Sequence, residues 1–229
     1  KTFTTTDAEG IAIQMVVDRS GSMRAHDFEL DGKPVDRLTA LKRVAADFVT
    51  GGDGLEGRTN DLVGLVTFAR FADASCPLTL DHAYTVDALR TAEIVRDERE
   101  DGTAIGDALG LAVERLRGLE ESRRDGASPV KSKVIVLLTD GENHAGDLDP
   151  MAAATLAETL GVKIYTIGVG TRGEAPVPVE DPFTGEMVTR WVQVSIDEEM
   201  LTKLAEATGG KYFRATDTDS LEQIYAEID

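Results

Sequence analysis

Residues 11–22 read IAIQMVVDRSGS, an apolar run that changes abruptly into a turn rich in oxygen-bearing side chains. The apolar run is typical of a strand that is buried on both faces of a parallel sheet. In the turn, Asp18, Ser20 and Ser22 alternate with other residues, so their oxygen atoms can converge on one point. Open α/β sheets bind ligands at the carboxyl ends of their strands. This stretch therefore predicts both a parallel sheet and a ligand site at its edge.

Strand-like and helix-like segments alternate along the rest of the chain. Further buried runs occur at residues 62–68 (LVGLVTF), 133–139 (KVIVLLT) and 163–169 (KIYTIGV), and amphipathic segments separate them. This alternation is typical of a doubly wound α/β fold with helices on both faces of a mostly parallel sheet. The short run at residues 72–80 follows residues 62–68 after a tight connection, so we expect it to form one antiparallel edge strand.

Residues 176–194 interrupt this rhythm. They contain three prolines and a turn signal at residues 182–185, followed by an alternating segment, which together predict an inserted β-hairpin. Phe183 and Trp191 can anchor a partner protein there. Alternatively, the hairpin only covers a sheet edge or extends the core. We interpret residues 1–229 as a single domain that begins with a polar tail at residues 1–10.

The composition excludes several classes of function. Asp and Glu outnumber Lys and Arg by 42 to 24, which gives a net charge of -18 and a pI of about 4.5. Nucleic acids and anionic lipid surfaces would be repelled, so neither is expected as the main partner. No apolar run approaches the ~20 residues of a membrane helix. We therefore expect a soluble segment that does not itself insert into a membrane.

Two more polar segments are expected at the same sheet edge as the first turn. One carries Thr103 directly before a predicted helix, and the other carries Asp140 directly after the strand at residues 133–139. Hydroxyl and carboxylate oxygens suit a hard cation such as Mg²⁺, with Mn²⁺ or Ca²⁺ as alternatives. Zn²⁺ fits less well, because no Cys or His stands nearby in the sequence. The predicted metal ligands are Asp18, Ser20, Ser22, Thr103 and Asp140.

These three motifs together resemble the metal-ion-dependent adhesion site of von Willebrand factor A domains. DxSxS follows the first strand, DGT precedes a helix, and TDG follows an apolar strand. The resemblance extends over nearly the whole chain, and it implies a non-enzymatic module that binds other proteins. In this family the serines and the threonine bind the ion directly, the aspartates often act through water, and an Asp or Glu carboxylate of the partner takes the vacant position.

A narrower resemblance is to the bacterial aerotolerance-type, or BatA-like, branch, through GTAIGDALGLAVERL, VIVLLTDGEN and IYTIGVG. In that branch the domain usually lies between membrane helices and is encoded with a MoxR-type AAA+ ATPase. This implies a membrane-anchored parent with an extracytoplasmic, periplasmic domain. Its implied partners are other von Willebrand A proteins or components linked to that ATPase. Arg19 departs from the small or apolar residue common in the branch, and it either reaches towards an acidic ligand or is a surface charge.

Two other functions fit the same residues less well. A Mg²⁺-dependent phosphoryl hydrolase would use Asp18 as its nucleophile, and such chemistry also needs a cationic clamp and usually an acid or base. Ser20 stands where a second acid would be expected, and no Lys follows at an obvious helix start. A metal-free scaffold is disfavoured because all five ligand positions are filled. We therefore expect a binding module and no enzyme activity.

Overall fold

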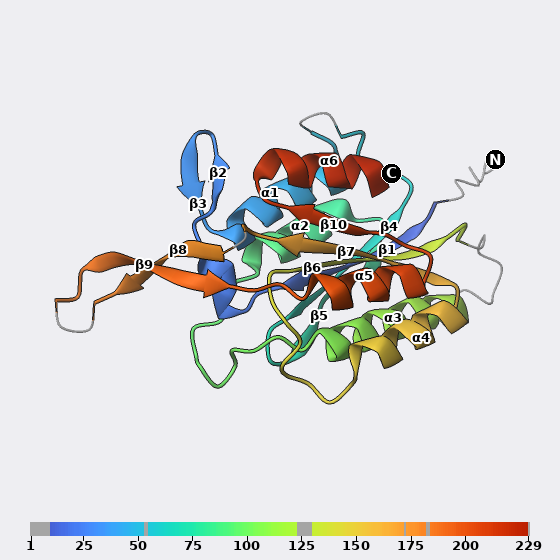
Figure 1. The fold of residues 1–229 in the computed structure, drawn as a ribbon. Helices are drawn as coiled ribbons and strands as arrows, with labels where there is room; N and C mark the ends of the chain where they lie inside the picture. The colour runs from blue at the N-terminus through green and yellow to red at the C-terminus, as the bar shows by residue number, and fades with distance from the viewer. Residues whose placement is uncertain (1–9, 53–54, 123–129, 172, 182–183, 229) are drawn as a thin grey trace.

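A computed structural model of the protein has a six-stranded sheet at its centre (Figure 1), with strands in the order β10-β7-β6-β1-β4-β5. The predicted N-terminal tail, apart from Gly10, lies outside the described residues. The structure describes residues 10–52, 55–122, 130–171, 173–181 and 184–228. The strands are β1 (Ala12–Asp18), β4 (Leu62–Phe68), β5 (Ala72–Thr79), β6 (Lys133–Thr139), β7 (Val162–Val169) and β10 (Tyr212–Ala215).

The strand directions confirm the predicted fold class. β1 pairs in parallel with both β4 and β6, and β7 pairs in parallel with β6 and β10. β5 lies at the edge of the sheet and is antiparallel to β4, as the tight connection between them predicted. Because β1 lies inside the sheet between two parallel neighbours, its carboxyl end opens at the edge where β4, β6 and β7 also end.

Helices cover both faces of the sheet (Figure 1), and each face has its own apolar core. Each helix buries one apolar stripe against the strands, which follows from apolar residues at helical spacing. Within the described ranges, no helix combines the length and apolarity needed to cross a bilayer. One face carries α1 (Arg37–Thr50), α2 (His82–Thr91) and α6 (Thr218–Ile228), and the other carries α3 (Ile105–Ser122), α4 (Pro150–Thr159) and α5 (Glu198–Ala207).

Aspartate side chains start several of these helices. Asp36 accepts a hydrogen bond from the backbone N–H of Thr39 at 2.8 Å, and Asp149 accepts one from Ala152 at 3.0 Å. Each of these bonds satisfies one of the N–H groups that a helix leaves unpaired in its first turn. Part of the acidic excess is therefore structural.

Two small hairpins stand apart from the main sheet. β8 (Gly173–Glu180) pairs with β9 (Met187–Val194), which confirms the predicted inserted hairpin, although it begins three residues earlier than expected. β2 (Phe28–Leu30) and β3 (Lys33–Val35) form a second hairpin, which we did not predict from the sequence. In Figure 1 both hairpins lie at the same end of the molecule, and the β8–β9 hairpin projects away from the body.

Candidate metal centre

Asp18 ends β1 and is completely buried. Its two carboxylate oxygens are both held. The backbone N–H of Ser20 donates to Oδ1 at 2.8 Å, and the Thr139 hydroxyl donates to Oδ2 at 2.6 Å. Thr139 is the last residue of β6, the strand next to β1. The neighbouring strand therefore fixes the orientation of this carboxylate.

The two serines of the first turn face one another. Their Oγ atoms are 3.0 Å apart, and the Ser22 hydroxyl donates to Oδ1 of Asp140 at 2.6 Å. Gly21 lies between them, and its N–H donates to Oδ1 of Asp101 at 2.8 Å. A Cβ at Gly21 would come within 2.6 Å of the Asp101 carboxylate, so a side chain there would displace that carboxylate. The glycine thus allows the loop before α3 to approach the first turn.

The predicted ligands come together at one cavity. Ser20, Ser22 and Thr103 line a cavity of about 360 Å³, together with His144 and four other residues. Asp140 is buried and is linked to this group through Ser22. A Cβ added at Gly141, directly after Asp140, would lie 3.3 Å from the Thr103 hydroxyl oxygen. The three loops therefore converge, with the hydroxyls at the cavity and the two aspartates buried beneath them.

Arg37 is a residue of this centre that the sequence analysis missed. It is fully buried, and its Nη1 donates to Oδ2 of Asp140 at 2.6 Å. Nε and Nη2 donate to Asp27 at 2.8 and 2.6 Å. Asp27 in turn accepts hydrogen bonds from the backbone N–H and the hydroxyl of Thr171, each at 3.0 Å. A continuous chain of hydrogen bonds thus runs from Asp140 to the segment that precedes β8.

Space beside Arg37 is limited by Gly170, where an added Cβ would lie 2.4 Å from the guanidinium carbon. One indirect signal for Arg37 was its position directly after the Asp36 helix cap. A charged residue at the start of a helix is, however, also typical of a solvated surface. Only the tertiary fold, which brings Asp27 and Asp140 to the same guanidinium, distinguishes the two cases.

Burial makes the carboxylates of this centre difficult to ionise. Burial, and then the nearby charge of Asp140, raise the pKa of Asp18 from 3.8 to about 7. Burial also raises the pKa of Asp140, although the positive charge of Arg37 acts in the opposite direction. For Asp27, burial is outweighed by hydrogen bonds from Arg37, so its pKa is lowered. The chain therefore supplies too little positive charge to stabilise the ionised forms of both Asp18 and Asp140.

The donor set fits a hard divalent cation. It combines two buried carboxylates with three hydroxyls, all of them oxygen ligands of the kind that Mg²⁺, Mn²⁺ and Ca²⁺ prefer. Within the part of the chain that the structure describes, no group of three or more His, Cys, Asp or Glu side chains is placed to hold a metal. An ion at this centre would therefore depend on the hydroxyls as much as on the two aspartates.

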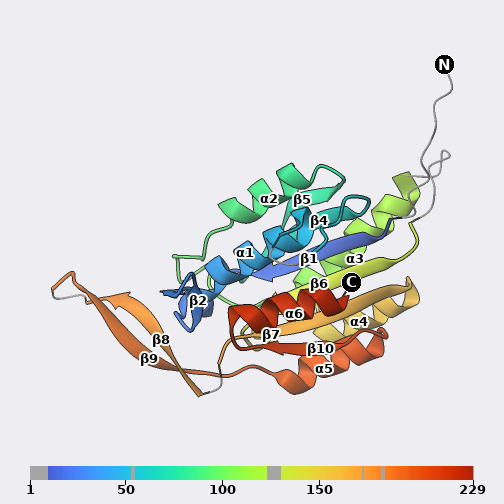
Figure 2. The ribbon, with the colours of Figure 1, turned by 90° about the horizontal axis from the view of Figure 1, so that it is seen from above.

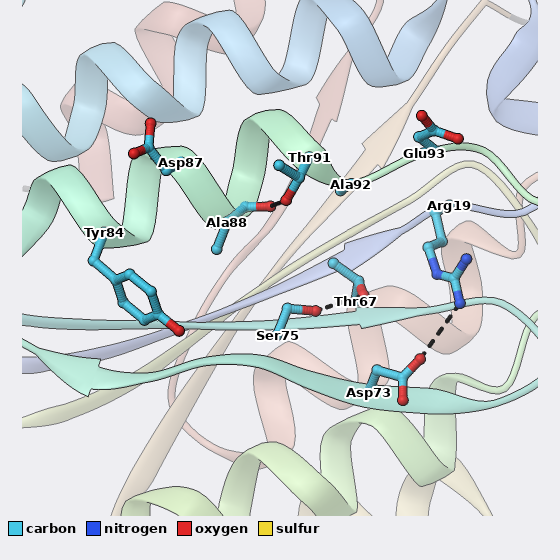
Figure 3. A pocket seen from close by; sticks show the side chains of 10 residues that line it. All are labelled: Arg19, Thr67, Asp73, Ser75, Tyr84, Asp87, Ala88, Thr91, Ala92 and Glu93. Atoms are coloured by element: carbon cyan, nitrogen blue, oxygen red, sulfur yellow. Dashed lines mark hydrogen bonds and ion pairs between the residues drawn. The ribbon is translucent and has the colours of Figure 1, made fainter.

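Arg19 does not face this cavity, although it lies next to Asp18 in the sequence. Figure 3 shows its side chain in a separate cavity of about 540 Å³, where its Nη2 lies 3.4 Å from the Asp73 carboxylate. Tyr84 of α2 lines the opposite side of that cavity. The predicted role of Arg19 in binding a partner stays a prediction, without support from proximity to the metal centre.

Of the two hairpin residues predicted to anchor a partner protein, Trp191 and Phe183, the structure describes only Trp191. Trp191 lies on β9 and is 65% exposed, so it is accessible to a partner. Phe183 lies outside the described residues. The base of the hairpin contacts the metal-centre loops at both ends. Thr171 reaches Asp140 through Asp27 and Arg37, while the Ser195 hydroxyl donates to Glu142 at 2.7 Å.

Comparisons with known proteins agree with this geometry. A family model of the von Willebrand factor type A domain matches residues 13–227. The chain belongs to this family. A UPF0353 protein from Mycolicibacterium paratuberculosis is 30% identical over 225 residues, which cover 95% of this chain and 59% of that relative. The chain therefore spans less than two thirds of that relative's length.

Two solved structures resemble this von Willebrand A domain. An aerotolerance-related membrane protein from Bacteroides fragilis is 27% identical, with a TM-score of 0.69 and coverage of 95% of this chain and 98% of that one. This likeness confirms the predicted resemblance to the aerotolerance branch. Proximal thread matrix protein 1 from the mussel byssus, with a zinc-occupied MIDAS motif, shares the fold at 23% identity and a TM-score of 0.61, over 96% of this chain and 44% of that one.

Proposed function

We propose that this domain is a metal-ion-dependent protein-binding module. A divalent cation held by Asp18, Ser20, Ser22, Thr103 and Asp140 would bind a carboxylate of a partner protein. The observation that carries this proposal is the placement of the ligands, since Ser20, Ser22 and Thr103 line one cavity, whereas Asp18 and Asp140 do not line it. A ligand that enters the cavity therefore meets the hydroxyl side of the centre first.

The charge of the centre supports an acidic partner group. The chain supplies two carboxylates to a divalent ion, and the charge of Asp140 is already shared with Arg37. A further carboxylate from a partner therefore completes the coordination shell without a large excess of negative charge. The ion also offsets the repulsion that the strongly acidic surface, with its net charge of -18, would exert on that carboxylate.

Mg²⁺ is the proposed resident ion. It binds to a small number of protein oxygens and retains water in its remaining positions, which suits a centre with few carboxylates. Mn²⁺ and Ca²⁺ remain alternatives, and the zinc in the mussel structure supports a divalent ion in this fold. When bound, the ion supplies an electrophilic position for a carboxylate oxygen, and the chain's own residues orient and bury it.

The phosphoryl hydrolase alternative is not favoured by the position of Asp18. A nucleophile must lie within reach of the atom that it attacks. Asp18 is fully buried, accepts hydrogen bonds from Ser20 and Thr139, and does not line the cavity. Phosphate transfer to this carboxylate would require the centre to open.

The setting of the domain in its parent protein is part of the same proposal. We propose a membrane-anchored parent, which the likeness to an aerotolerance-related membrane protein supports, and we propose that this domain lies outside the cytoplasm. Proposed partners are proteins that present Asp or Glu, including other von Willebrand A proteins and components linked to a MoxR-type ATPase. We further propose that the β8–β9 hairpin, whose base contacts the centre, selects among them.

Calorimetric titration of the domain with Mg²⁺ and Mn²⁺ tests the metal, with Thr103→Val as the disrupting variant and Ser75→Ala as a hydroxyl control in the Arg19 cavity. Wild type and Ser75→Ala should bind, and Thr103→Val should bind much more weakly. Acetate then serves as the carboxylate probe, because Mn²⁺ held by the domain should broaden its proton signal more than that of methylammonium. A folded domain that binds neither metal at millimolar concentration contradicts the proposal, as does metal-dependent hydrolysis of a generic phosphate ester.

A further inference from the structure

The β8–β9 hairpin forms a sheet of its own and extends beyond the body of the domain in Figure 1 and in Figure 2. Its second strand exposes large apolar side chains, with Met187 66% exposed and Trp191 65% exposed. Val188 and Val192, which point to the opposite face, are exposed as well. An isolated two-stranded hairpin is at best marginally stable in water, whereas three or more strands can be stable. Pairing with further strands would therefore stabilise the β8–β9 hairpin.

The outer edge of β8 is blocked against such pairing. The carbonyl of Pro176 accepts a hydrogen bond from His26, which lies outside the hairpin, so position 176 faces away from β9. At the turn, the N–H of Asp181 donates to the carbonyl of Glu186 on the β9 side. The backbone groups of the odd-numbered residues of β8 therefore face β9, and those of the even-numbered residues face away from it. Pro178 shares the outward parity of Pro176. Neither proline has an N–H to offer, and proline is a common means of protecting an edge strand.

The outer edge of β9 has no such protection. Thr189 pairs with Pro178 and Trp191 pairs with Pro176, so these positions also face outward, because the two members of a cross-strand pair share one orientation. The outward-facing backbone groups therefore include those of Met187, Thr189 and Trp191. Among the described residues, no backbone hydrogen bond outside the hairpin involves any of these three. The edge consequently offers a row of donors and acceptors that an extended chain can pair with in place of water.

We propose that β9 pairs antiparallel with β9 of a second copy, so that two hairpins join into one four-stranded sheet. The strand is suited to its own copy, because MVTRWVQV contains no Asp or Glu in a chain that has 42 of them. If the twofold axis passes at Thr189, Met187 faces Trp191 of the partner subunit and Val188 faces Arg190 of the partner subunit. Thioether–aromatic contacts are favourable, and no like charges lie opposite one another in this register.

The length of the projecting β8–β9 hairpin also limits the electrostatic repulsion between the two copies. Each copy carries a net charge of -18, which opposes association of the two bodies. In this register, five residues on each side separate the axis from the base of each hairpin at Val194, so the bases lie about 33 Å apart at about 3.3 Å per residue. This distance is several times the Debye length of about 8 Å at physiological ionic strength. The hairpins can therefore pair while the acidic bodies remain screened from each other.

Sedimentation of the metal-free domain tests this association, because the proposed edge does not include the metal ligands. The proposed interface is small, so we expect a reversible monomer–dimer equilibrium between about 10 μM and about 1 mM. Thr189→Pro removes one outward N–H and leaves the hydrogen bonds inside the hairpin in place, and it should weaken dimerisation at least about tenfold, a loss of about 1.4 kcal/mol. Thr189→Ala is the matched control, since it keeps the N–H, and it should dimerise like wild type.

Two further measurements keep the result interpretable if Thr189→Pro disturbs the hairpin. Trp191 is the only tryptophan of the chain, so its emission should shift to the blue as the wild-type concentration rises. Hydrogen exchange at Met187, Thr189 and Trp191 should slow over the same concentration range. A wild-type protein that stays monomeric up to about 1 mM overturns the proposal and leaves the edge to a different protein. A dimer without these changes at Trp191 and Thr189 overturns it as well.

Discussion

Asp18→Asn removes a buried negative charge while it keeps the shape of the side chain. Burial and the charge of Asp140 raise the pKa of Asp18 from 3.8 to about 7. This pKa difference of about 3 units corresponds to roughly 4 kcal/mol of unfolding free energy, which is lost when Asp18 ionises in the folded protein. The amide can still accept from Ser20 and can donate to Thr139. In the absence of metal, we therefore expect the variant to be more stable than wild type above pH 7, by up to roughly 4 kcal/mol.

The sign of the pH dependence follows from the raised pKa of Asp18. Between about pH 4 and pH 7 the folded state still holds the proton that the unfolded state has released, so the contribution of Asp18 to stability falls as the pH rises. Asn does not titrate in this range. The difference in unfolding free energy between variant and wild type should therefore be close to zero at about pH 4 and should reach its maximum above pH 7.

Urea unfolding with a chelator present, followed by far-ultraviolet circular dichroism, measures this difference. Asp73→Asn is a suitable control, because that carboxylate is exposed at the rim of the Arg19 cavity and its removal should change stability little. Added Mg²⁺ should stabilise wild type and leave Asp18→Asn unchanged, since only a competent site contributes binding energy. The reasoning is refuted if, above pH 7 in chelator, Asp18→Asn is equal to or less stable than wild type.

Three other predictions follow from the same centre. Mg²⁺ affinity should rise with pH up to about pH 7, by up to about tenfold per unit, with about one proton released on binding, as calorimetry in buffers of different ionisation enthalpy would show. Arg37→Met should lower the unfolding free energy by about 3–5 kcal/mol, because it leaves two buried carboxylates without their cation, whereas the exposed Arg43→Met should change it little. Replacing residues 180–189 with a short Gly-Ser link should reduce partner binding and leave Mg²⁺ affinity unchanged in a titration; full partner affinity would contradict the role of the hairpin.

The parts of the fold that depend on hydrophobic pattern were predictable from the sequence. The runs at residues 62–68 and 133–139 became strands with the same boundaries, because continuous apolar segments have few other stable placements than the interior of a parallel sheet. The antiparallel edge strand followed from the length of its connection alone. The five predicted ligands converged for a related reason, since strand order brings the carboxyl ends of neighbouring strands to one edge.

What we missed depended on local turn chemistry or on distant contacts. Asp31-Gly32 is a strong hairpin signal, and both residues have positive φ values of 52° and 70°, but the strands on either side are only three residues long. Arg37 and Asp27 carry no pattern of their own. Their importance arises only when a residue more than one hundred positions away, Asp140, is brought to the same guanidinium.

The shared support of the metal centre and the hairpin gives these missed residues their significance. Arg37 binds Asp140 on one side and Asp27 on the other, and Asp27 holds Thr171 at the base of β8. Arg37 is fully buried, so neither contact can be replaced by water without opening the core. Removing Arg37 should therefore disturb both the ion and the hairpin. The Gly-Ser replacement lies beyond Thr171 and should disturb the hairpin alone. Comparing the two variants therefore distinguishes binding of a carboxylate by the ion from selection of the partner by the hairpin.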